Sequence, residues 1–168
     1  ALRRFDNGSR PVMVATDLAS RGLDIEGVAS VIHYHQALTS EAYTHRNGRT
    51  ARQDADGDIY LLVGPDEDVK DFADIDDEMH LDTSVAGNLR SGLSTLYINA
   101  GKKEKVSKGD VLGFLVKECG VEPSAIGRID VADHYALAAV ASPEAVVAAE
   151  RATGKKLKGE RRRVSLME

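Results

Sequence analysis

Two segments of the sequence gather residues suited to contacts with phosphates and sugars. The first covers residues 15–25 and reads ATDLASRGLDI. The Thr16 hydroxyl can donate to a phosphate oxygen, Gly22 allows close backbone approach, and Asp24 can accept hydrogen bonds from a ribose. On spacing alone, an ordinary strand-to-turn connection with capping residues remains an equal alternative.

The second segment covers residues 43–52 and reads YTHRNGRTAR, with arginines at 46, 49 and 52. Residues three apart on a helix face each other, so crowded arginines are costly unless an anion neutralises them. Guanidinium forks suit the dispersed charge of a transferring phosphoryl group, and such an arginine can accelerate the transfer by about 10³–10⁵. The alternative is a solvated basic face paired with the acidic segment that follows.

The C-terminal half offers residues of a different kind. Tyr97 and Tyr135 could stack on unpaired bases, each contributing about 1–3 kcal/mol. The loop GKKEKVSKGD, residues 101–110, contains four lysines and leads into a predicted helix, a shape and charge suited to phosphates. Ordinary packing of the tyrosines and simple solvation of the lysines are the alternatives.

The elements that would position the first two segments form an α/β layer. Apolar, β-branched runs predict strands over residues 11–16, 29–34 and 58–63, and a serine cap predicts a helix over 40–50. Parallel strands bind ligands at their carboxyl ends, where the first segment lies. Residues 66–82 are acidic with apolar residues at helical spacing, which predicts a surface helix, and the Gly-, Ser- and Asn-rich residues after them resemble a linker.

The remaining residues follow the order βαββαβ. The predicted strands cover 95–99, 126–131, 135–140 and 162–166, and the predicted helices cover 108–119 and 143–153. This order gives a four-stranded antiparallel sheet with two helices on one face and the other face free to bind a ligand. We therefore divide the chain into a first domain (1–82), a linker (83–94) and a second domain (95–168).

Charge also separates the two halves. Residues 1–95 carry 9 Lys or Arg against 17 Asp or Glu, whereas the rest carries 13 against 10, so the formal charge changes from −8 to +3. A basic half within an acidic chain is compatible with nucleic-acid binding. Cys119 is the only cysteine, which excludes an intrachain disulfide and suits a reducing compartment. No apolar run has the length of a transmembrane helix, and we expect a cytoplasmic protein that extends upstream of Ala1.

The two N-terminal segments, taken together and in this order, resemble the fifth and sixth motifs of the DEAD-box RNA helicases. The resemblance covers residues 1 to about 82 and implies the last part of the second RecA-like domain. It implies that Thr16, Arg21 and Gly22 lie along the RNA backbone. It also implies that Asp24 contacts the ATP ribose, with Gly22 beside the nucleotide.

The same resemblance assigns roles in the second motif. It implies that Arg49 and Arg52 are the catalytic arginines that reach the γ-phosphate of ATP, and that His45 and Arg46 lie at the interface between the two RecA-like domains. The chain departs from the family at Asn47, where an apolar residue is usual, and at the acidic residues 54–56.

Two helicase motifs are missing from these residues: the G-x-x-x-x-G-K-[ST] phosphate loop and the Asp-Glu-Ala-Asp motif. ATP and Mg²⁺ would accordingly be held mainly by an N-terminal domain, with no metal-ligating residue in this segment. We expect the segment alone to be inactive as an ATPase.

The sequences INAGKKEKVSKGDVLGFL, AIGRIDV and KLKGERRRV resemble the C-terminal domain of DbpA-type helicases, which grips a hairpin of large-subunit ribosomal RNA. The resemblance implies an RNA-recognition-motif-like domain and a role in ribosome assembly. The candidate RNA-binding residues are Tyr97, Lys102, Lys103, Lys105, Lys108, Arg128, Tyr135, Lys155, Lys156, Lys158 and the arginines 161–163.

These observations leave three hypotheses. The first is part of an ATP-dependent RNA helicase, with RNA and ATP as partners and no membrane. The second is a non-enzymatic RNA-binding module. The third, a protein-interaction domain that uses the acidic residues 66–82, rests on charge alone.

Overall fold

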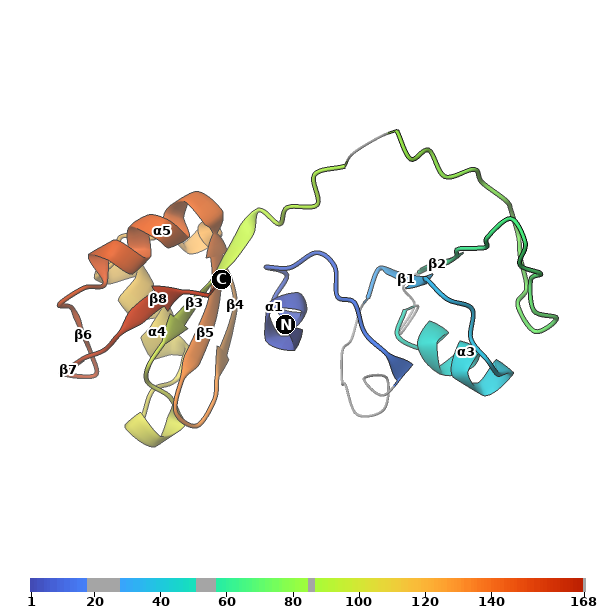
Figure 1. Ribbon diagram of the computed structural model, residues 1–168. Helices are drawn as coiled ribbons and strands as arrows, with labels where there is room; N and C mark the ends of the chain where they lie inside the picture. The colour runs from blue at the N-terminus through green and yellow to red at the C-terminus, as the bar shows by residue number, and fades with distance from the viewer. Residues whose placement is uncertain (18–27, 51–56, 85–86, 168) are drawn as a thin grey trace. The chain divides into compact units, whose positions relative to one another are not determined.

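The computed structural model of the chain describes residues 1–17, 28–50, 57–84 and 87–167. The chain divides into two compact units, one of residues 14–87 and one that joins residues 1–13 to residues 88–168 (Figure 1). The division after residue 87 falls inside the linker expected at 83–94. Residues 1–13, which the sequence assigns to the first domain, therefore group by their contacts with the second unit.

The unit of residues 14–87 contains a parallel pair of strands, β1 (Ser30–His33) and β2 (Asp58–Leu61). The helix α3 (Ser40–Asn47) lies between them in sequence. Strand, helix and parallel strand in this order confirm the α/β class predicted for the first domain. The helix is capped by Thr39, whose hydroxyl accepts from the Ala42 amide at 3.2 Å, so the predicted cap was one residue late.

The strand predicted at residues 11–16 is wrong. No regular structure covers this stretch, and the side chains of Val12 and Val14 are 52% and 95% exposed. A buried parallel strand needs a hydrogen-bonded neighbour, and in the part of the chain that the structure describes no strand pairs with these residues. The apolar run therefore stays outside the sheet.

The helix predicted at residues 66–82 is also wrong, because the structure shows only turns and irregular backbone there. Acidic residues crowd this stretch, and like charges three or four residues apart destabilise a helix. Phe72 contacts Tyr43 of α3, with ring centroids 5.7 Å apart. Val69 and Met79 remain 40% and 77% exposed, so only part of the expected apolar face is covered.

The second unit is built on a four-stranded antiparallel sheet with strand order β4-β5-β3-β8. Its strands are β3 (Leu93–Ile98), β4 (Ile126–Val131), β5 (Ala136–Ala141) and β8 (Val164–Leu166). The helices α4 (Lys108–Lys117) and α5 (Ser142–Arg151) cover one face (Figure 1). This arrangement confirms the predicted α+β fold.

Alternation along the strands decides which face holds the core. Leu96 and Ile98 of β3 are fully buried and pack with Val111 and Leu115 of α4. Residues at the positions between them, such as Tyr97, point to the opposite face. The sheet therefore buries its helix side and presents its second face to other parts of the unit.

Several short elements complete this unit. They are the helix α1 (Leu2–Asp6), the 3₁₀ turns η1 (Lys102–Glu104) and η2 (Pro123–Ala125), and a hairpin of β6 (Lys156–Leu157) and β7 (Glu160–Arg161). The sequence did not predict the hairpin. Among the residues described, no helix has the length and apolar character needed to cross a membrane.

Candidate nucleic-acid interface

Arg46 connects the two predicted helicase motifs. Its Nε donates to Asp17 Oδ1 at 2.6 Å and its Nη2 donates to Asp17 Oδ2 at 2.8 Å, so the guanidinium grips the carboxylate with two parallel bonds. The hydrogen bonds with Asp17 raise the pKa of Arg46. Its third nitrogen donates to the His35 carbonyl oxygen at 2.8 Å. Arg46 thus connects Asp17 of the first motif with His35, which follows β1, an arrangement the sequence did not predict.

The buried imidazole of His33 contacts the last turn of α3. His33, at the end of β1, is 1% exposed, and its Nε2 lies 2.8 Å from Asn47 Oδ1. Arg46 Nη1 lies 3.3 Å from His33 Nδ1, and since guanidinium only donates, the ring proton is placed on Nε2. Asn47, the departure from the family pattern, is therefore the acceptor for a buried imidazole. Tyr43 packs on the same ring at a centroid distance of 5.1 Å.

The structure describes three of the other residues predicted in this half, and the rest lie outside the described residues. Thr16 is exposed, and His45 is exposed on the last turn of α3. Because α3 ends at Asn47, Arg49 lies in the turn after it and is half-buried. The predicted residues outside the described part of the chain are Arg21, Gly22, Asp24 and Arg52.

The lysine-rich loop of the second unit has a fixed backbone. A side-chain carbon on Gly101 would overlap the carbonyl groups of Ala132 and Asp133, so only glycine fits there. The amides of Lys102 and Lys103 donate to those same two carbonyls at 2.9 Å each. The loop is therefore pinned to the turn between β4 and β5.

Two carboxylates complete the geometry of this loop. Glu104 Oε2 accepts from the Gly101 amide at 2.7 Å, a bond that lowers the pKa of Glu104. Asp110 accepts from the backbone and hydroxyl of Ser107, which caps α4, and Lys158 lies 2.9 Å from it. These bonds lower the pKa of Asp110 to about 2. Backbone amides and the carboxylates of Glu104 and Asp110 therefore hold the shape of the loop.

Tyr97 and Tyr135 lie together on the sheet face that does not carry the helices. Their rings are 5.7 Å apart between centroids, at an interplanar angle of 23°. Leu137 is paired with Tyr97 across β3 and β5 and is 3% exposed. The predicted aromatic pair is thus brought together, beside an apolar neighbour rather than a third aromatic ring.

A pocket of about 560 Å³ opens next to Tyr135. Lys102 and Lys108 line it from the lysine-rich loop and the start of α4, and Leu137 lines it from β5. Arg3 of α1 lines it as well, a residue for which the sequence gave no functional signal. Cations around an aromatic wall suit a nucleotide, since phosphate and base are met by different side chains.

The remaining basic candidates divide by their ion pairs. Arg128 lies 2.9 Å from Asp6 and 3.2 Å from Asp130, and Lys155 lies 3.5 Å from Glu118. Lys102, Lys105 and Lys156 form no ion pair with a described carboxylate, and Lys105 has a left-handed backbone with φ of 59°.

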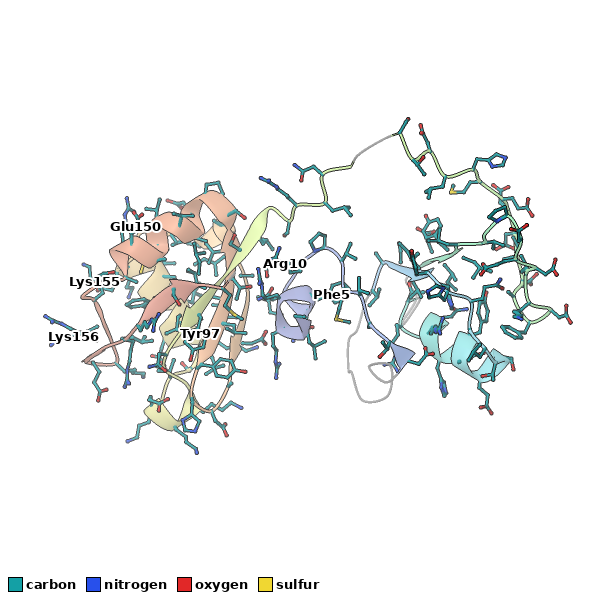
Figure 2. All side chains as sticks on the ribbon, in the orientation of Figure 1. Phe5, Arg10, Tyr97, Glu150, Lys155 and Lys156 are labelled. Carbon is teal, nitrogen blue, oxygen red and sulfur yellow. The ribbon has the colours of Figure 1, made fainter. Side chains whose placement is uncertain are left out.

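Lys155 and Lys156 lie away from Tyr97, at the β6–β7 end (Figure 2). The arginines 161 and 163 are exposed and Arg162 pairs with Glu160.

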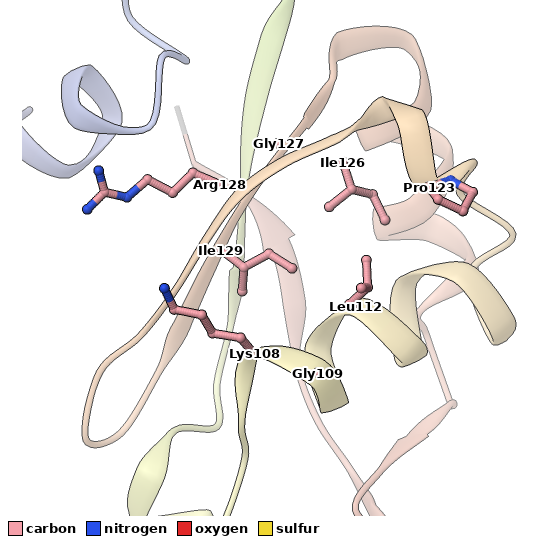
Figure 3. Close-up of a pocket in the computed structure, with 8 residues that line it drawn as sticks. All are labelled: Lys108, Gly109, Leu112, Pro123, Ile126, Gly127, Arg128 and Ile129. Atoms are coloured by element: carbon pink, nitrogen blue, oxygen red, sulfur yellow. The ribbon is translucent and has the colours of Figure 1, made fainter. Parts of the chain in front are cut away.

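A second hollow, of about 470 Å³, lies between α4 and β4. Figure 3 shows the side chains of Leu112, Ile126 and Ile129 converging in it while Arg128 projects away. Its lining is apolar, apart from Lys108 and Arg128. Arg128 is therefore directed towards Asp6 rather than into this hollow.

Comparisons with known proteins agree with this geometry. The helicase conserved C-terminal domain model matches residues 1–54, and the DbpA RNA binding domain model matches residues 95–166. The ATP-dependent RNA helicase DbpA of Escherichia coli is 37% identical over 99% of this chain and 38% of its own length. The ATP-dependent RNA helicase mak5 of Aspergillus clavatus is 39% identical over 66% of this chain and 17% of its own length. The chain thus spans well under half of these relatives.

The parallel α/β unit overlaps the match to the helicase C-terminal domain, and the antiparallel sheet domain with its lysines and stacked tyrosines coincides with the match to the DbpA RNA binding domain. The chain is similar to RNA helicases over almost its whole length, and residues 95–166 match an RNA-binding domain of the DbpA kind.

Proposed function

We propose that this chain is the C-terminal part of a cytoplasmic, ATP-dependent helicase that remodels large-subunit ribosomal RNA during ribosome assembly. One observation carries the proposal: Arg46 binds Asp17 and so joins the two helicase motifs into one substructure. Through this link, a change at the residues that contact ATP would be passed on to the residues that contact RNA.

In this proposal the residues after β1 and α3 form half of an ATP site. Arg49, in the turn after α3, and Arg52 stabilise the charge that spreads over the transferring phosphoryl group. Asp24 and Gly22 hold the nucleotide sugar, while Thr16, Arg21 and Gly22 follow the RNA backbone. Arg46 and His45 act at the domain interface, with Arg46 positioned by Asp17.

The donors in this half fit a phosphate rather than a metal ion. The described residues include no group of three or more His, Cys, Asp or Glu side chains that could hold a metal. We therefore assign cationic residues to the nucleotide and none of the described residues to Mg²⁺. When bound together with ATP, Mg²⁺ would supply positive charge to the phosphates.

The second unit supplies target choice. Lys102, Lys103 and Lys105 contact phosphates of an RNA hairpin, and the stacked Tyr97 and Tyr135 offer a surface for unpaired bases. Two findings support RNA as the ligand: the name of the E. coli relative, ATP-dependent RNA helicase DbpA, and the match of residues 95–166 to the DbpA RNA binding domain. The ribosomal target rests on the resemblance to DbpA-type domains.

The first test is RNA binding by the chain across a salt series. It compares a hairpin of large-subunit ribosomal RNA with a scrambled hairpin, using the native chain and a Lys102→Ala/Lys103→Ala/Lys105→Ala variant. We expect tighter binding of the ribosomal hairpin, lost in the variant, with a salt slope lower by about 1 for each phosphate contact removed. A variant that replaces Lys117, at the far end of α4, by Ala is the control. Equal affinity for both hairpins would contradict the ribosomal target.

The second test addresses the ATP site. The chain replaces the matching 38% of the E. coli relative, so that the relative supplies all of the remaining sequence, and RNA-stimulated ATP hydrolysis is measured. We expect Arg49→Ala to lower the rate by about 10³-fold or more, while Arg90→Ala, outside both motifs, leaves it unchanged. A chimera that binds RNA equally with and without nucleotide would instead identify a non-enzymatic RNA-binding module.

A further inference from the structure

Residues 1–13 are fixed to the second unit by a buried polar cluster. Asn7 Nδ2 donates to Thr95 Oγ1 at 3.0 Å, and the hydroxyl oxygens of Ser9 and Thr95 lie 2.6 Å apart. Asn7, Ser9 and Thr95 are 5%, 6% and 0% exposed. Buried polar groups are costly unless paired, so three that satisfy one another specify a single arrangement.

Contacts on either side extend this attachment. Asp6 Oδ1 accepts from Arg128 Nη1 at 2.9 Å, and Ser91 Oγ donates to the Gly8 carbonyl at 2.6 Å. Gly8 has a φ of 77°, in the left-handed region that favours glycine. The segment therefore meets β3, β4 and the residue run ahead of β3.

Thr95 projects from β3 on the face without helices, as Tyr97 does. The expectation that this whole face is free to bind a ligand is thus wrong: residues 7–9 cover the part around Thr95. The alternation of side chains along β3 shows which residues share a face of the sheet. It does not show that a segment more than 80 residues away in the sequence covers that face. What remains open is the end of the face near Tyr135.

That open end is where the 560 Å³ pocket lies, and α1 supplies one of its walls. Arg3 lines the pocket opposite residues of the RNA-binding domain: Lys102, Lys108, Tyr135 and Leu137. Asp130 also lines it, with its charge paired to Arg128. The volume lies within the range of about 300–1,000 Å³ typical of small-ligand sites, and three cations beside a tyrosine match a phosphate with its base.

We propose that residues 1–13 dock on the sheet of the RNA-binding domain and complete a pocket for one RNA nucleotide, in which Arg3 contacts the phosphate. The proposal rests on RNA binding as proposed above. Since residues 1–13 fall within the match to the helicase domain model, the nucleotide in this pocket is held by residues of both matched regions.

Docking is tested by disulfide trapping in the full chain, with Cys119, the only native cysteine, replaced by Ala. Ser9→Cys/Thr95→Cys places two thiols where hydroxyl oxygens now lie 2.6 Å apart, a separation compatible with a disulfide. Ser9→Cys/Ser94→Cys is the matched control, because Ser94 donates to Ser142 of α5 on the other face. We expect rapid oxidation of the first pair only. Equal or absent trapping in both would overturn the docking.

The pocket is tested by RNA affinity. Arg3→Ala is expected to weaken binding of the ribosomal hairpin about five- to tenfold and to lower the salt slope by about 1. Arg10→Ala is the matched control, an exposed arginine of the same segment outside the pocket, and is expected to bind as the native chain does. Trapping of the Ser9/Thr95 pair in the Arg3→Ala background shows whether the segment still docks.

The outcomes separate this inference from the proposed function. Loss of RNA binding in the Lys102/Lys103/Lys105 variant, together with native affinity of Arg3→Ala, would overturn the composite pocket and leave the RNA-binding function intact. The oxidised Ser9→Cys/Thr95→Cys chain is expected to bind RNA with unchanged affinity. Loss of binding on oxidation, restored by reduction, would mean that the segment blocks the RNA site and would also overturn the inference.

Discussion

Arg46 and Asp17, 29 residues apart in sequence, form a two-bond pair in which Nε lies 2.6 Å from Oδ1 and Nη2 lies 2.8 Å from Oδ2. The Arg46 side chain is 23% exposed and the Asp17 side chain 56%, so water weakens the attraction without removing it. The pair matters for geometry: it fixes the residue after Thr16 relative to the helix that precedes Arg49.

Arg46→Lys is therefore predicted to loosen α3 although the charge is kept, because an ammonium cannot form the fork. A double-mutant cycle of Arg46→Lys with Asp17→Asn is expected to give a coupling free energy of about 0.5–1 kcal/mol. Hydrogen exchange of the α3 amides measures it within this unit alone. A coupling of zero would show that the pair contributes nothing to the position of the helix.

Asn47→Leu is predicted to destabilise the first unit, although leucine is closer to the apolar residue usual in the family. The change removes the acceptor for His33 Nε2, which lies 2.8 Å from Asn47 Oδ1 on a side chain only 1% exposed. An unsatisfied buried donor costs about 1–3 kcal/mol. Hydrogen exchange in β1 and α3 measures the loss.

Two variants control this prediction. Asn47→Asp keeps an acceptor oxygen and is expected to cost less than Asn47→Leu. His33→Leu/Asn47→Leu removes both polar partners and is expected to recover part of the stability. If the double variant proved less stable than Asn47→Leu by the full effect of a second lost side chain, the hydrogen bond would not be the cause.

Gly101→Ala is predicted to destabilise the RNA-binding domain. The added carbon would overlap the carbonyl groups of Ala132 and Asp133, to which the Lys102 and Lys103 amides donate, and such overpacking costs about 1–3 kcal/mol. Gly113→Ala is the matched control: its new carbon meets no atom within 4 Å in α4, and alanine is the better helix former by about 0.8–1 kcal/mol. Thermal unfolding should move in opposite directions for the two variants.

The sequence predicted the second unit well because its signals are local and complete. Residues 95–168 contain all four strands of the sheet, so Leu96 and Ile98 find the helices that their alternation requires. The boundaries of β4 were predicted without error, and those of the other main elements to within about two residues. The β6–β7 hairpin was missed because strands of two residues carry no periodicity.

The first unit shows the opposite case. The spacing of Val69, Phe72, Ile75 and Met79 is helical, yet the crowded acidic residues disfavour the helix. Phe72 contacts Tyr43 of α3, but Val69, Ile75 and Met79 stay at least 40% exposed. Residues 11–16 have a strand composition, but strand formation depends on a partner that composition does not reveal. The roles predicted for Arg46 and Arg49 rest on their residue types rather than on the backbone expected around them, and they stay predictions.

Of the candidate site, the sequence predicted the lysines and tyrosines, but it did not predict the pocket that Lys102, Lys108 and Tyr135 line. Strand register pairs Tyr97 with Leu137, which places Tyr135, two residues earlier, on the same face and next to Tyr97. Arg3 and Asp17 could not be singled out, since their partners depend on contacts between distant parts of the chain.

The stability of the RNA-binding domain is predicted to depend on pH through the carboxylate of Asp110. Its bonds to Ser107 and Lys158 lower the pKa from the ordinary 3.8 to about 2. A carboxylate whose pKa is lower in the folded than in the unfolded state stabilises the fold fully above the ordinary pKa, and this contribution is lost as the pH falls towards 2. Asp110→Ala should therefore be less stable than the native chain at neutral pH and equally stable near pH 2.

Urea denaturation of both chains between neutral pH and pH 2 measures this difference. Lys158→Met is the informative control: it removes the ion pair, 2.9 Å long, but leaves the Ser107 cap in place. We expect it to show part of the Asp110→Ala effect over the same pH range, because Ser107 is the larger cause of the lowered pKa. A stability difference for Asp110→Ala that stayed constant down to pH 2 would assign the effect to the lost side chain rather than to its charge.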